Sequence, residues 1–124
     1  MWATWDRHPL LTPEMEVLVY SCIQAECAKM GAELIAIGGL PDHVHLLARV
    51  PAALSVAELV KQVKGTSSHL ANHSGATNSA FKWQGAYGAF TVSKGSVKKL
   101  SDYIARQKQH HADRTVYQEY EPGD

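Results

Sequence analysis

The stretch GGLPDHVHLLARV, residues 38–50, decides the fold. Glycine and proline mark a turn up to Asp42, and an apolar-rich run then continues until Pro51 stops it. Side chains alternate between the two faces of a strand. One face of a strand over 43–50 is therefore wholly apolar and indicates a core: Val44, Leu46, Ala48 and Val50. The opposite face carries His43, His45, Leu47 and Arg49.

The two histidines share one face and lie about 6–7 Å apart along the strand. That separation allows two imidazoles to converge on one divalent ion. A lone His-x-His pattern is more often a pair of buried histidines that are hydrogen-bonded to backbone groups. Asp42 either orients one imidazole as an acceptor or is only a turn residue. The pattern by itself leaves these interpretations open.

Upstream of this stretch the pattern predicts a strand, a helix and a second strand. MWATW at 1–5 alternates weakly, as a short strand does. TPE at 12–14 predicts a helix start, because threonine caps, proline suits the first turn and an acid favours the positive end. Gly31 predicts the helix end, and ELIAIG at 33–38 predicts a buried strand. The helix carries an apolar stripe of Met15, Leu18, Val19, Cys22, Ile23, Cys27 and Met30.

Downstream, SVAE at 55–58 is a capping box and predicts a helix that runs to about Asn72. A polar loop follows. Residues 81–92 then read as an extended segment, broken at Gly85 and Gly88. The residues expected to face inward from the helix are Val56, Leu59, Val60, Val63 and Leu70.

A last helix is capped by Ser93 or Ser96 and runs to about His111, with Val97, Leu100 and Ile104 as its apolar positions. The first six elements then follow the split β-α-β order of ferredoxin-like folds. We therefore expect an α+β fold, an antiparallel sheet with helices packed on it, plus a C-terminal helix. A chain of 124 residues has room for one domain, 1–124.

The charge of the chain is zero in total but unevenly distributed. Residues 55–111 carry eight basic side chains against two acidic ones, whereas each flanking part is acidic. A basic second half is compatible with a phosphate-binding surface. It is equally compatible with solvated helix faces.

The cysteines and the apolar runs bear on the cellular compartment. Cys22 and Cys27 fall on one predicted helix, where their Cα atoms would lie about 8–9 Å apart, beyond disulfide reach. Reduced thiols suit the cytoplasm. The longest apolar run, around Leu34 to Leu40, is too short to span a bilayer, and the first residues do not read as a signal peptide. We expect a cytoplasmic protein without a membrane partner.

The last helix offers candidates for a third metal ligand and a nucleophile. Tyr103 and Gln107 stand four residues apart, and so on one helix face, with Lys99 one turn earlier. A glutamine oxygen is a hard ligand that suits Mg²⁺ or Mn²⁺ better than zinc. Taken singly, Tyr103 is more often a half-buried core aromatic, and Gln107 a surface residue.

The helix after 55 predicts a basic face with Lys61, Lys64 and Ser68, and Gly65 leaves a gap beside them. A glycine costs up to about 1 kcal/mol inside a helix, so close approach of another group is one explanation. Basic residues beside aromatic ones are typical of a single-strand binding platform, although strand aromatics are more often core. The aromatic residues that follow are Phe81, Trp83, Tyr87 and Phe90.

Four stretches occur together in one order: LPDHVHLLARV, VKGTSS, WQGAYGAFTVS and DYIARQKQHH. In this combination the chain resembles the insertion-sequence 200/605 family of single-tyrosine transposases, which carry a His-hydrophobic-His pair. The resemblance runs from Trp2 to about Tyr120. Compared with the family, we expect a first strand shortened at Met1 and a shortened C-terminal tail.

The resemblance implies a role for each matching position. His43 and His45 match the metal-binding pair, Gln107 the third ligand, and Tyr103 the nucleophile. Family members are dimers in which the tyrosine helix of one subunit can serve the histidine pair of the other. They cleave and rejoin single-stranded DNA at element ends and recognise small hairpins.

The implied chemistry is an attack of Tyr103 on a phosphodiester that leaves a 5′-phosphotyrosine and a free 3′-hydroxyl, with Mg²⁺ or Mn²⁺ offsetting the developing charge. Lys99 and a water on the metal are candidates for the base. The residues expected to contact the DNA backbone are Lys61, Lys64, Lys94, Lys98 and Lys99.

Two other functions are compatible with the sequence. One is a non-catalytic module, derived from such a transposase, that binds single strands or hairpins. The other is a zinc hydrolase, which is disfavoured because no third histidine, cysteine or acid follows His45 at zinc-motif spacing. A covalent protein–DNA adduct would separate the transposase from the binding module.

Overall fold

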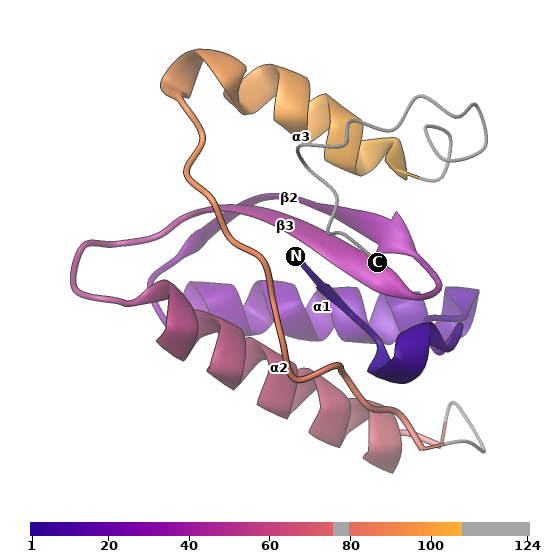
Figure 1. The fold of residues 1–124 in the computed structure, drawn as a ribbon. Helices are drawn as coiled ribbons and strands as arrows, with labels where there is room; N and C mark the ends of the chain where they lie inside the picture. The colour runs from indigo at the N-terminus through magenta and orange to yellow at the C-terminus, as the bar shows by residue number, and fades with distance from the viewer. Residues whose placement is uncertain (76–79, 108–124) are drawn as a thin grey trace.

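The computed structural model describes residues 1–75 and 80–107. Its architecture is a small antiparallel sheet with two long helices on one face and a short helix on the other (Figure 1). This is the α+β class that the sequence predicts. The strands are β1 (Trp2–Ala3), β2 (Glu33–Leu40) and β3 (His43–Arg49). The helices are α1 (Pro13–Lys29), α2 (Val56–His73) and α3 (Val97–Ala105), with short 3₁₀ turns η1 (Trp5–Arg7) and η2 (Lys94–Ser96).

Strand β3 occupies the centre of the sheet, in the order β1-β3-β2, and it is antiparallel to both neighbours. The tight turn at Pro41 and Asp42 joins β2 to β3, so that Leu40 lies opposite His43. On its other side β3 pairs with only two residues, Trp2 and Ala3. Where it leaves the turn, the histidine-bearing strand is therefore paired with a neighbouring strand on both sides.

The caps predicted for α1 and α2 are confirmed. The Thr12 hydroxyl accepts from the backbone N–H of Met15 at 3.3 Å, and the Ser55 hydroxyl accepts from that of Glu58 at 3.0 Å. The inward face of α2 was predicted only in part: Leu59 and Val63 are buried, but the side chains of Val56 and Leu70 are exposed. The buried row of α2 consists of Leu59, Val63, Ser67 and Ala71, spaced four residues apart.

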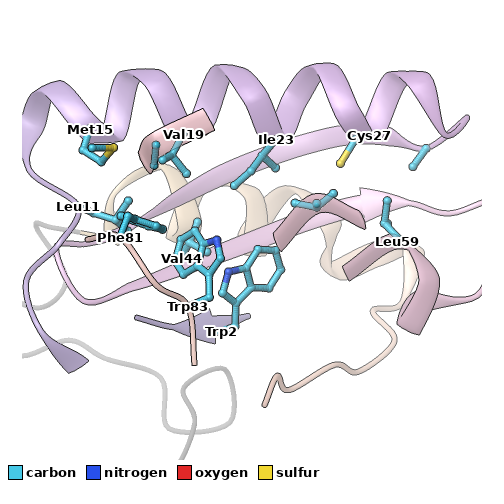
Figure 2. Packing of buried hydrophobic residues seen from close by; sticks show 13 residues of the cluster. Trp2, Leu11, Met15, Val19, Ile23, Cys27, Val44, Leu59, Phe81 and Trp83 are labelled. Atoms are coloured by element: carbon cyan, nitrogen blue, oxygen red, sulfur yellow. The ribbon is translucent and has the colours of Figure 1, made fainter. Parts of the chain in front are cut away.

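The main hydrophobic core lies between the sheet and the pair α1–α2 (Figure 2). Met15, Val19 and Ile23 from α1 meet Val44 of β3 there. Trp2 and Trp83 pack edge to face, with ring centroids 5.7 Å apart. This cluster confirms that the wholly apolar face of residues 43–50 faces the core.

The helix α3 packs on the opposite face of the sheet (Figure 1). Its contact is close at Gly38 of β2, where an added β-carbon would lie 2.1 Å from the carbonyl oxygen of Ile104. Glycine lets the two backbones approach because it has no side chain. Four residues form the small buried cluster between α3 and the sheet: Leu47, Leu100, Tyr103 and Ile104.

The predicted extended segment 81–92 does not form a strand, and this part of the prediction was wrong. One isolated antiparallel bridge, between Thr4 and Trp83, and several hydrogen bonds join it to the N-terminal segment. The backbone N–H of Gln84 donates to Ala3 at 2.9 Å, and that of Gly88 donates to Met1 at 2.9 Å. With β1 only two residues long, the segment has little strand to pair with, yet it runs where the fourth strand of the predicted order would lie.

Beyond Gly88 this segment leads across the sheet edge to α3 (Figure 1). A groove of about 820 Å³ lies along this edge, lined by Leu46 to Arg49 of β3, by Val50, by 88–92 and by residues of α2 and α3. Tyr87 and Phe90 are exposed, whereas Phe81 and Trp83 belong to the core. Only part of the predicted aromatic platform is therefore on the surface.

The last helix begins at Val97, after η2, and its regular part ends at Ala105. Neither Ser93 nor Ser96 makes the predicted side-chain cap. The predicted continuation from 108 to His111 lies outside the described residues. Among the residues that the structure describes, no helix is long and apolar enough to cross a membrane.

Candidate functional site

The side chains of His43 and His45 lie together on the face of β3 that is opposite the main core. Their ring centroids are 5.2 Å apart and their planes are nearly perpendicular, at 84°. Both residues are buried, with 1% and 5% exposure. The alternation of β3 thus brings two imidazoles side by side under α3, as the strand period predicts.

Tyr103, on α3, meets this pair, and Gln107 follows it one helical turn later in the chain. The ring of Tyr103 packs edge-on to that of His45, with centroids 6.3 Å apart. Tyr103 is 2% exposed and Gln107 is 1% exposed. The interpretation of Gln107 as a surface residue is therefore wrong, because the glutamine is buried one helical turn beyond the tyrosine.

Asp42 joins His43 to a third side chain. The Nδ1–H of His43 donates to Asp42 Oδ1 at 2.8 Å, and the other carboxylate oxygen pairs with Nε of Arg7 at 3.4 Å. An ionised carboxylate only accepts, which assigns the proton of the neutral imidazole to Nδ1 and leaves the lone pair on Nε2. Asp42 is thus more than a turn residue.

The turn that carries Arg7 has an unusual backbone. Asp6 and Arg7 both have φ of +53°, in the left-handed region. A residue other than glycine costs roughly 1–2 kcal/mol in that conformation. The neighbouring loop holds the turn in place: the Asp6 N–H donates to Gln84 Oε1 at 3.2 Å, and Lys82 Nζ lies 3.8 Å above the ring of Trp5.

The donor types of His43, His45 and Gln107 are compatible with a divalent metal. Two neutral imidazoles and a glutamine amide oxygen suit a borderline-to-hard ion such as Mn²⁺ or Mg²⁺, and the Asp42 contact fixes one imidazole as carboxylate partners of ligating histidines do. Within residues 1–75 and 80–107, no three His, Cys, Asp or Glu side chains gather as a metal site.

The five predicted DNA-contacting lysines lie in two layers. Lys61 and Lys64 belong to α2, whereas Lys94, Lys98 and Lys99 precede or belong to α3 on the other face of the sheet (Figure 1). Lys98 Nζ pairs with Asp102 at 3.2 Å on the exposed side of α3. All except Lys64 are exposed.

Lys64 is half-buried, and its ammonium donates to the backbone carbonyls of Gln84 and Ala86. Burial lowers the pKa of Lys64 below its ordinary value. These contacts tie the loop after Trp83 to α2. An added β-carbon at Gly65 would have nothing within 4 Å, so the gap beside Lys64 is open.

Two residues of the site environment were not predicted. Arg7 stands in a short polar stretch with no periodicity, and its contact with Asp42 depends on a left-handed turn that propensity disfavours. Gln84 holds that turn from a distant part of the chain. The one sequence feature that pointed to Gln84 was its place directly after Trp83, among the aromatic residues of 81–90.

A family model described as "Transposase IS200 like" matches residues 1–107. The ISDra2 transposase TnpA of Deinococcus radiodurans is 27% identical over 112 residues, which cover 86% of this chain and 80% of that protein. A crystal structure described as a transposase of Deinococcus radiodurans R1 superposes with a TM-score of 0.68 and 27% identity. That match covers 86% of this chain and 85% of the other.

Proposed function

The chain belongs to the family of IS200-like transposases, and from that premise we propose that it cleaves and rejoins single-stranded DNA at the ends of an insertion sequence. The nucleophile in this proposal is Tyr103. The observation that carries it is the burial of Tyr103 against His45, 6.3 Å between ring centroids, with the ring of His43 next to that of His45.

The phenolic oxygen of Tyr103 attacks the phosphorus of a phosphodiester. The bond from phosphorus to the 3′-oxygen breaks, that oxygen takes up a proton, and the 5′-phosphate stays joined to the tyrosine. A 3′-hydroxyl then attacks the phosphotyrosine, reforms a phosphodiester and releases the phenol. Because bond energy is kept in the phosphotyrosine, the strand is rejoined without ATP.

A phenol with a pKa near 10 is a weak nucleophile at neutral pH, so a base and charge stabilisation are needed. His43, His45 and Gln107 would hold the metal, Mg²⁺ or Mn²⁺, which offsets the charge that develops on the phosphate. Lys99, one turn before Tyr103 and exposed, is our candidate for the base.

Access to Tyr103 constrains how the reaction proceeds. At 2% exposure its side chain is buried, with its ring edge-on to that of His45. A DNA strand therefore reaches the phenol only once Tyr103 is uncovered, as a movement of α3 away from β3 would achieve. This movement is compatible with a homodimer in which the tyrosine helix serves the partner subunit, which we propose as the working assembly.

We propose that the exposed lysines contact the phosphates of the DNA. Lys94, Lys98 and Lys99 lie at the start of α3, close to the nucleophile in sequence, and Lys61 lies on α2. Lys64 is a weaker candidate because its ammonium is engaged by two backbone carbonyls. The substrate we propose is a single strand that carries a hairpin near the cleavage site.

A second function is favoured by the same burial. With Tyr103 covered, a non-catalytic module that binds hairpins without cleaving them would have the structure described. The sequence keeps all four site residues, and this favours the enzyme.

The deciding experiment incubates the protein with 5′- and 3′-labelled single-stranded hairpins and Mg²⁺ and looks for a covalent adduct. We expect an adduct that retains label on the 3′ side of the cut and is lost in Tyr103→Phe. Tyr87→Phe, at an exposed tyrosine, is the matched control and should retain it. Hairpin binding without any adduct would identify the binding module instead.

A further inference from the structure

The Asp42 carboxylate contacts two cationic or potentially cationic side chains at once. Oδ1 accepts from His43, and Oδ2 faces Nε of Arg7. Each oxygen therefore has its own partner, and the carboxylate plane is fixed by both. Removal of the guanidinium would leave the carboxylate free to rotate about its last torsion angle.

The orientation of Asp42 matters because of what it does to the imidazole. His43 is buried, and the Nδ1–H that points to Asp42 leaves Nε2 as the nitrogen with a lone pair. If the carboxylate turns away, the other tautomer becomes accessible, and Nε2 then carries the proton. A carboxylate held in one orientation keeps the ligand nitrogen available.

Several hydrogen bonds hold the turn that places Arg7 for this contact. The N–H of Arg7 donates to Thr4 at 3.1 Å, and the Thr4 hydroxyl donates to the carbonyls of His8 and Asp42, at 2.6 and 3.2 Å. Gln84 accepts from the N–H of Asp6. Two successive left-handed residues persist only where surrounding contacts over-determine them, and such outliers cluster at functional sites.

We propose that Arg7 is a positioning residue for His43: through the Asp42 carboxylate it holds the imidazole with its proton on Nδ1 and its Nε2 lone pair available as a ligand. The proposal rests on the proposed function for the identity of that ligand as a metal. The effect on the tautomer of His43 does not depend on it. Arg7 touches no reacting atom.

The test uses Arg7→Gly in the full chain. Glycine adopts a positive φ without strain, so this variant removes the guanidinium while it relieves the backbone, and a loss of folding does not obscure the result. Two readouts are taken: the ¹⁵N shifts of the His43 ring in the metal-free protein, and the dissociation constant for Mn²⁺ by calorimetry.

We expect the wild type to show the Nδ1–H tautomer and Arg7→Gly to populate the other one. Loss of a direct partner of a ligating histidine weakens metal binding about 10–100-fold. Arg7 acts one step further away, so we expect a loss of about 3–10-fold, with partial rescue by Arg7→Lys. Asp42→Ala should give the larger loss.

Arg49→Ala is the matched control, because it removes a guanidinium from an exposed ion pair with Glu33 on the same strand as the histidines. It should change neither readout. In the Asp42→Ala background, Arg7→Gly should have no further effect, since the pathway is already broken.

The inference is overturned if Arg7→Gly leaves the His43 tautomer unchanged, or if it weakens Mn²⁺ binding by the same factor with and without Asp42. A wild type that shows the expected tautomer but binds no Mn²⁺ contradicts the proposed metal function alone. The two failures are thus distinguishable.

Discussion

Gly38 and Ile104 approach so closely that a β-carbon on the glycine would lie 2.1 Å from the Ile104 carbonyl oxygen. The neighbour of Ile104 is Tyr103, and Gly38 pairs with His45 across the sheet. The contact therefore sets the distance between the helix of Tyr103 and the strand of the histidines. The Ile104 carbonyl belongs to the helix backbone, so it cannot move aside for an added β-carbon as a flexible side chain could.

Gly38→Ala should consequently push α3 away from the sheet. We expect a loss of about 1–3 kcal/mol in the free energy of unfolding, the usual cost of overpacking. Urea unfolding measures this effect. Gly65→Ala, in a helix interior with open space, is the control and should stabilise by about 0.5–1 kcal/mol.

We expect the free energy of unfolding to depend on pH through Glu26. Hydrogen bonds from the side chains of Gln62 and Thr66 lower the pKa of this carboxyl, and these bonds join α1 to α2. Because the folded pKa lies below the unfolded one, the stabilisation is complete above the unfolded value, 4.5, and is lost as the pH falls through the folded value.

Urea unfolding between pH 7 and pH 3 tests this prediction. Wild type should exceed Glu26→Gln in stability at neutral pH, and the difference should shrink on acidification. A difference that stays constant over this range would show that the charge of Glu26 contributes nothing.

Ser67 supports the tryptophan core from α2. Its Oγ accepts from the indole N–H of Trp83 at 2.9 Å, and both side chains are buried. Ser67→Ala leaves that donor without its acceptor, so we expect a loss of about 1–3 kcal/mol, measured by tryptophan fluorescence during urea unfolding. The neighbouring Ser68→Ala, at the surface side of the helix, should stay within about 0.5 kcal/mol of wild type.

Removal of divalent metal should abolish chemistry and leave the fold intact. The His43 ring is already held by Asp42, and β3 is held by its pairing with β2, so folding does not depend on an ion. With EDTA we expect no covalent adduct but an unchanged circular dichroism spectrum, and a return of the adduct on addition of excess Mn²⁺. Adduct formation in EDTA would contradict the assignment of His43, His45 and Gln107 as metal ligands.

The part of the fold that the sequence predicted rests on strong local patterns. The alternation over 43–50 separated a core face from a histidine face, and the capped start of α1 fixed its first turn. Val56 and Leu70 were misplaced because α2 buries a narrow row, which includes Ser67, rather than every apolar residue. Residues 81–92 have strand composition, but strand formation requires a partner, and β1 offers only Trp2 and Ala3.

The sequence predicted single residues of the site but not how they are arranged in space. A spacing of four residues placed Tyr103 and Gln107 on one face, but no helical pattern reveals that this face covers β3. Arg7 reaches Asp42 through two left-handed residues, a conformation that single-residue propensities do not predict. Contacts between residues far apart in sequence and dependent on an unusual backbone remain hidden from pattern analysis.

The two faces of the sheet carry cores of very different size. Among the residues that the structure describes, the buried hydrophobic cluster against α1 and α2 has thirteen members, whereas the cluster under α3 has four: Leu47, Leu100, Tyr103 and Ile104. Regions with few buried contacts open locally at a lower free energy than the whole protein unfolds. The amides of α3 should therefore exchange with deuterium sooner than those of α1. The proposed nucleophile, Tyr103, would then be delivered by a sub-global opening of α3, while the histidine strand stays folded on the larger core.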